Sequence, residues 1–76
     1  MAGQLQASWV TIATTAVIAH YNAAVESEFM SLWKEAEKEY ETAYKLALHV
    51  MNPDNPMTQR IRSALAKMRI KVRNGV

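Results

Sequence analysis

The side chains best suited to chemistry in this sequence are two histidines, His20 and His49. They lie 29 residues apart, and neither has a second histidine or a carboxylate at the spacing that a metal site on a helix requires. We therefore expect no metal site. We predict that His20 lies on the inner side of a first helix with a polar contact, and that His49 lies on the outer face of a second.

Closely spaced glutamates could supply a general acid and a general base. Glu35 and Glu39 share one helix face, as do Glu37 and Glu41, but nothing in the pattern desolvates them or adds a nucleophile. We expect a solvated acidic flank. The serines stand in no Gly-x-Ser-x-Gly context, and the glycines are too near the chain ends to form a phosphate-binding loop. The sequence predicts a protein that is not an enzyme and has no cofactor or small-molecule substrate.

The composition indicates one small packed domain over residues 1–76. Half of the residues are hydrophobic, 21% are charged and none is cysteine, which excludes disulfides and thiolate zinc sites. A chain this short buries only about 60% of its unfolded surface, so association with another molecule would be a natural source of further stability.

The first 33 residues contain no Lys or Arg, so no signal peptide is expected. Residues 2–25 carry no formal charge, but threonines, glutamines, His20 and Asn22 interrupt this apolar stretch. We interpret it as a helix covered by protein, and a membrane partner is not expected. A cytoplasmic or virion-associated location is the corresponding expectation.

The strongest turn signal is the segment Asn52-Pro53-Asp54-Asn55-Pro56. Pro53 pushes Asn52 out of helical geometry, and Asn55 can cap a new helix that has Pro56 at its first position. We place the turn at residues 52–56 and a helix at about 57–73, followed by Asn74-Gly75 as a stop signal.

Neither Gly nor Pro occurs between Gln4 and Asn52, so one long helix or two shorter helices fit this region. Asn22 and Ser27 are plausible N-caps, and we favour a break between them, with helices at about 5–22 and 25–51. A strand over residues 9–18 is the alternative, because that segment is rich in β-branched residues.

Apolar residues repeat at three- and four-residue steps through residues 25–51 and again through 57–72. This spacing places them on one face of each helix. The sequence therefore predicts an all-α fold of three helices, in which the second and third form an antiparallel hairpin joined by the Asn-Pro turn.

Charge is distributed unevenly along the chain. Residues 1–24 carry none, residues 25–51 have six Glu and three Lys, and residues 52–76 have one Asp and six Lys or Arg, so the segment charges are 0, −3 and +5. One interpretation is that the acidic and basic flanks meet in the hairpin. The other is that the last helix contacts nucleic acid, an acidic protein or an anionic membrane, through Arg60, Arg62, Lys67, Arg69, Lys71 and Arg73.

Five aromatic residues carry most of the large apolar area and are candidates for a protein interface as well as for the core: Trp9, Phe29, Trp33, Tyr40 and Tyr44. The run Leu-Trp-Lys-Glu-Ala-Glu-Lys-Glu-Tyr over residues 32–40 resembles helices of many small phage and mobile-element proteins, including helical pieces of virion connectors. The resemblance implies a chain encoded by a phage or a mobile element.

The leading hypothesis is an assembly protein that self-associates or docks on a larger complex through its first helix and the aromatic face of its second. The first alternative is a small basic regulator that binds nucleic acid through the third helix. The second alternative is a stoichiometric inhibitor of a larger enzyme or defence complex.

Overall fold

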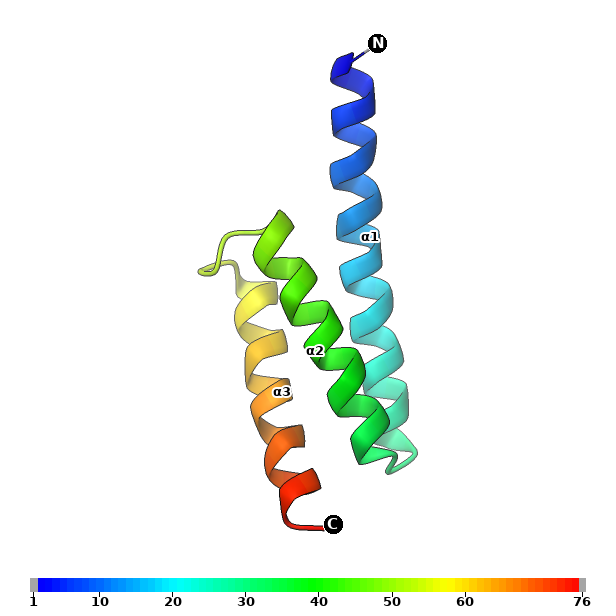
Figure 1. Cartoon of the computed structure of the whole chain (residues 1–76), viewed down its shortest axis with the longest axis vertical. Coiled ribbons are helices and arrows are strands. Elements are labelled where there is room, and N and C mark those ends of the chain that lie inside the picture. Colours follow the sequence, from blue (N-terminus) through cyan, green and yellow to red (C-terminus); the bar gives the residue numbers. More distant parts are fainter. Residues whose placement is uncertain (1, 76) are drawn as a thin grey trace.

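Three helices make up the fold. The computed structural model describes residues 2–75, and the side chains of residues 9–75. Within that range the helices are α1 (Ala2–Phe29), α2 (Trp33–Val50) and α3 (Pro56–Arg73), and there is no strand. Figure 1 shows α2 between α1 and α3, with consecutive helices antiparallel. The predicted all-α fold and the antiparallel hairpin of the second and third helices are confirmed, whereas the strand alternative is wrong.

The turn between α2 and α3 forms for the local reasons that the sequence suggested. The side-chain oxygen of Asn52 accepts a hydrogen bond from the backbone N–H of Asp54 at 3.0 Å. Asn55 is the N-cap of α3, and its side-chain oxygen accepts from the N–H of Met57 at 2.8 Å. Pro56 then occupies the first helical position, where its missing N–H has no intrahelical partner to lose.

The junction between α1 and α2 differs from the prediction. The expected break between Asn22 and Ser27 is wrong, because α1 continues to Phe29 and α2 begins only at Trp33. No residue in that interval forces the chain out of helical geometry. The chain leaves it at Ser31, which has a left-handed φ of 59°.

Two backbone hydrogen bonds close this junction. The N–H of Leu32 donates to the carbonyl of Ser27 at 2.9 Å, and the N–H of Ser31 donates to that of Glu28 at 3.0 Å. This pair of bonds is the Schellman arrangement, which usually has glycine at the left-handed position. Serine there removes the sequence signal that would have located the end of α1.

The core is centred on the face of α2 that contains three fully buried alanines, Ala36, Ala43 and Ala47, around the ring of Tyr40. The small side chains let the outer helices approach closely. α1 contributes Ala13, Val17 and Ala24, and α3 contributes Ile61, Leu65 and Met68. Phe29, predicted to share the apolar face of the second helix, lies instead at the end of α1 and is 85% exposed.

The first helix is much longer than its neighbour. With a rise of about 1.5 Å per residue, the 28 residues of α1 span about 42 Å and the 18 residues of α2 about 27 Å. Figure 1 shows that the N-terminal part of α1 therefore extends past the end of α2. Within the described residues, none of the helices combines the length and the apolar character needed to cross a membrane.

We expect Ser31→Gly to raise the free energy of unfolding by about 1 kcal/mol, measured by urea denaturation. A non-glycine residue costs roughly 1–2 kcal/mol in the left-handed region, and the larger unfolded-state entropy of glycine offsets part of that gain. Ala19→Gly, at an exposed position inside α1, is the control and should lower stability by about 1 kcal/mol. If both variants lost the same free energy of unfolding, the backbone at Ser31 would not be strained.

Candidate protein-binding surfaces

The N-terminal part of α1, residues 2–12, projects beyond α2 and is called the arm here. Among its described side chains, Trp9 is 58% exposed, Val10 48% and Ile12 67%. At about 100° per residue these three side chains spread over roughly 160° of the helix circumference. The arm thus presents apolar groups in several directions, and the first of the predicted interface aromatics, Trp9, lies on it.

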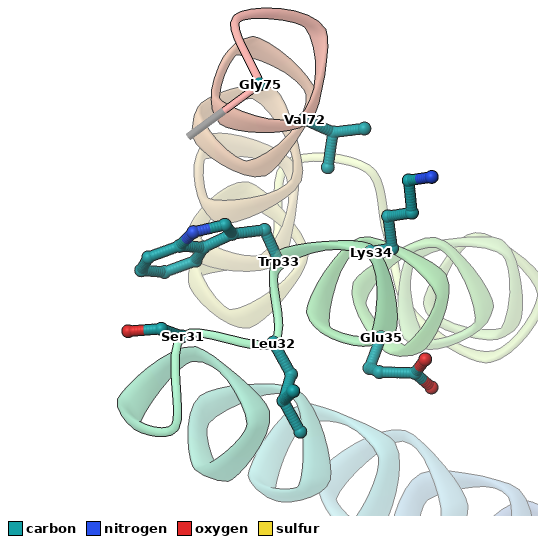
Figure 2. Close-up of a pocket in the computed structure, with 7 residues that line it drawn as sticks. All are labelled: Ser31, Leu32, Trp33, Lys34, Glu35, Val72 and Gly75. Atoms are coloured by element: carbon teal, nitrogen blue, oxygen red, sulfur yellow. The ribbon is translucent and has the colours of Figure 1, made fainter.

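A second exposed apolar surface lies at the α1–α2 junction. Phe29, Met30 and Leu32 are all exposed there, and Trp33 is half-buried beside them. Figure 2 shows the indole of Trp33 directed away from the side chains of Lys34 and Glu35. A hollow of about 370 Å³ at this junction is lined by Leu32, Trp33, Lys34 and Glu35 and also reaches Val72 near the end of α3.

One basic side chain is engaged at this surface. The Nζ atom of Lys71 lies 4.0 Å from the centroid of a Trp33 ring, at a distance typical of a cation–π contact. Lys71 therefore ties the end of α3 to the start of α2. A further hollow of about 360 Å³ lies between these two side chains and Val25, Glu28 and Phe29 of α1.

Tyr40 is part of the core, with 2% of its surface exposed. Its hydroxyl donates to Oε1 of Glu28 at 2.8 Å, and its ring meets Tyr21 edge-on with the centroids 5.9 Å apart. Burial, followed by the hydrogen bond to Glu28 and the negative charge there, raises the pKa of the Tyr40 hydroxyl well above its usual value. This contact joins α1 to α2.

The predicted interface aromatics are not brought together on one face. Trp9 is on the arm, Phe29 and Trp33 are near the junction, Tyr40 is in the core, and half-buried Tyr44 packs beside it. The expected aromatic face of the second helix is thereby reduced to Trp33 and Tyr44. Sequence reasoning grouped Leu32 with Phe29 but missed Met30 as their neighbour, since this grouping depends on the unforeseen end of α1.

The two histidines lie where the sequence placed them. Nδ1 of His20 is 2.9 Å from Oε2 of Glu39, which gives the predicted polar contact on the inner side of α1. His49 is exposed on α2, also as predicted. Glu39 was expected in a solvated flank, but it is half-buried against α1. Within residues 9–75 no group of three or more metal-ligating side chains comes together.

The predicted basic residues lie along α3, and all except half-buried Lys71 are exposed. Nη2 of Arg69 is 3.2 Å from Oε2 of Glu41 on α2, and Lys45 approaches the same carboxylate at 3.9 Å. Among the described side chains this is the one ion pair between α2 and α3. The expected meeting of acidic and basic flanks is thus limited to one exposed contact, which contributes roughly 0 to 1 kcal/mol.

A groove separates α1 from α3. It has a volume of about 480 Å³, with Tyr21 and Ala64 on its walls and Arg60, Lys67 and Glu28 also lining it. The outer helices both pack against α2, so this side of the molecule stays open. Arg60 and Lys67 therefore face a different side of α3 from Arg69.

We expect Tyr40→Phe to abolish a component of the pH dependence of stability. Because folding raises the pKa of this hydroxyl, its contribution is fully present below about pH 10, the value for an unfolded tyrosine, and is lost as pH rises towards the folded pKa. The difference in unfolding free energy between the wild type and Tyr40→Phe should change above about pH 10, with the wild type falling more steeply. If the unfolding free energies of the two proteins changed in parallel from neutral to strongly alkaline pH, Tyr40 would not have a buried neutral hydroxyl.

Comparison with protein-family models, with curated protein sequences and with solved structures found no match to this chain. The surfaces that bear on function are the apolar arm, the α1–α2 junction and the basic helix α3.

Proposed function

We propose that this chain is a non-enzymatic assembly protein that binds a second copy of itself through α1. The observation that carries the proposal is the arm, which is helical and has exposed apolar side chains that no element among the described residues covers. Trp9, Val10 and Ile12 expose about half or more of their surface there. Contiguous exposed apolar groups of this kind are typical of protein–protein interaction sites.

The arm requires cover because of its length and composition. Residues 2–12 extend α1 past the end of α2 (Figure 1), and most helical stability in proteins comes from packing of an apolar face, which α2 does not supply there. Val10, Thr11 and Ile12 are β-branched, which lowers helix propensity further. Packing against another molecule would stabilise the helix, since burial of apolar side chains supplies most helical stability in proteins.

A second copy of α1 suits the arm because residues 2–25 carry no formal charge. Two identical charged helices would repel each other when paired, whereas two uncharged ones do not. Antiparallel pairing of α1 with its copy would use the same patch on both subunits, as twofold symmetry requires.

The molecule is large enough to form such an interface. A standard interface buries about 800 Å² on each partner, which is about 15% of the 5334 Å² of accessible surface here. The assembly role also agrees with the resemblance of residues 32–40 to helices of virion-associated proteins. That resemblance supports the proposal without specifying a partner.

The test is the association state of Ile12→Gln, measured by sedimentation velocity over a range of micromolar concentrations. We expect the wild type to form dimers or larger assemblies, and the substitution to weaken association about tenfold or more, equivalent to a loss of about 1.4 kcal/mol. Thr42→Gln is the matched control, because Thr42 is also exposed but is polar and lies on α2, outside the proposed interface. It should leave association unchanged.

Circular dichroism of both variants would verify that the bundle is still helical. Monomeric wild-type protein at every concentration would overturn the proposal. Equal weakening by the two substitutions would show that the apolar side chain of Ile12 is not part of the interface.

A further inference from the structure

The outward surface of α3 contains cations without acids. Pro56–Arg73 has six Lys or Arg residues and no Asp or Glu, and along the sequence the nearest acidic residue is Asp54 in the preceding turn. We call the exposed members the basic face: Arg60, Arg62, Lys67, Arg69 and Arg73. This surface is separate from the arm.

The rest of the chain compensates little of this charge. Within the described side chains, Arg69 is the one member of the basic face with a carboxylate within 4.0 Å. That carboxylate belongs to Glu41, which also lies near Lys45. Lys71 is occupied by the Trp33 ring. The basic face is therefore suited to a polyanionic partner.

The cations form two rows. At about 100° per residue, Arg62, Arg69 and Arg73 lie on one side of the exposed surface, and Arg60 and Lys67 lie roughly 150° away on the other. The ion pair of Arg69 with Glu41 places the first row beside α2, and the groove shared with Tyr21 places the second row towards α1. Between the rows lie smaller or less polar side chains, including Ser63, Ala66 and Ile70.

This arrangement fits a DNA duplex. A helix with its side chains is about 10–12 Å across, and the major groove is about 12 Å wide, so cations on both flanks of a helix can reach the phosphates of both strands. An anionic membrane fits less well, because insertion requires an apolar face directed at the lipid. The apolar face of α3, which includes Ile61, Leu65 and Met68, is buried in the core.

We propose that α3 lies along the major groove of duplex DNA and binds its phosphates through the basic face. The contacts are mainly to the backbone, so the binding has little dependence on base sequence. With five cations at phosphates, the logarithm of the affinity should fall with the logarithm of salt concentration with a slope of about −4.5. This inference depends on α3 and is independent of self-association through α1.

The test is fluorescence anisotropy of a labelled random-sequence DNA duplex, titrated with the full chain at several salt concentrations. The double variant Arg62→Gln/Arg73→Gln removes two cations from the basic face. We expect it to reduce the magnitude of the salt slope by about 1.8 and to weaken binding at least tenfold at low salt. Neither arginine contacts a carboxylate within the described residues, so the bundle should remain folded.

The matched control is Lys34→Gln/Lys38→Gln, which removes the same net charge from exposed positions of α2. It should change duplex binding by less than about threefold, because the lost charges do not face phosphates. An RNA duplex should bind more weakly than DNA, since its major groove is too narrow for a helix. Sedimentation of the arginine variant should show unchanged self-association.

Several outcomes would overturn the proposal. The first is that the duplex does not bind at low salt. The second is that both double variants lose the same affinity, and the third is that the DNA and RNA duplexes bind equally well. Stronger binding to vesicles containing anionic lipid than to DNA, with the same dependence on Arg62 and Arg73, would assign the basic face to a membrane surface instead.

Discussion

Both outer helices pack against one narrow face of α2, in which Ala36, Ala43 and Ala47 surround the ring of Tyr40. The three alanines are fully buried, and their small side chains allow the backbones of α1 and α3 to approach α2. Tyr40 supplies the bulk that the alanines lack and reaches Glu28 of α1 through its hydroxyl. Loss of this packing would leave α1 and α3 without a common support, because they pack little against each other.

That packing also determines which surfaces remain available. α2 covers α1 only as far as its own length allows, so the arm extends beyond it. α3 turns its apolar residues towards the same face of α2, and its cations are consequently directed outwards. The apolar arm and the basic face thus arise from one constraint: a helix of 18 residues supports both a helix of 28 residues and a strongly basic helix.

Much of this fold could be predicted from the sequence, because strong local signals and tertiary packing agree there. The Asn-Pro turn, the Asn55 cap and the apolar periodicity of α2 and α3 act over a few residues, and each was predicted correctly. The end of α1 could not be located, since it depends on Ser31 in a conformation that glycine normally adopts. For the same reason Phe29 was placed on the wrong helix, and the grouping of exposed apolar residues at the junction was not predicted.

The candidate surfaces were predicted less well than the fold. The sequence identified the uncharged first helix and the basic third helix, but side-chain pairing across helices is a tertiary property. The expected charge matching between α2 and α3 is limited to Arg69 and Glu41, while Glu39 pairs with His20 on the opposite side of α2. The pattern of charges along the chain shows which helices are basic or acidic, but it does not show which charges are neutralised.

In the proposed assembly the arm is ordered through contact with a second copy of the chain. Amide hydrogen exchange of residues 2–12, followed over a wide range of protein concentrations, tests it most directly. We expect the protection of the arm amides to rise with protein concentration, while the amides around Tyr40 are already strongly protected at the lowest concentration. Arm amides that exchange at the same rate at every concentration would contradict it.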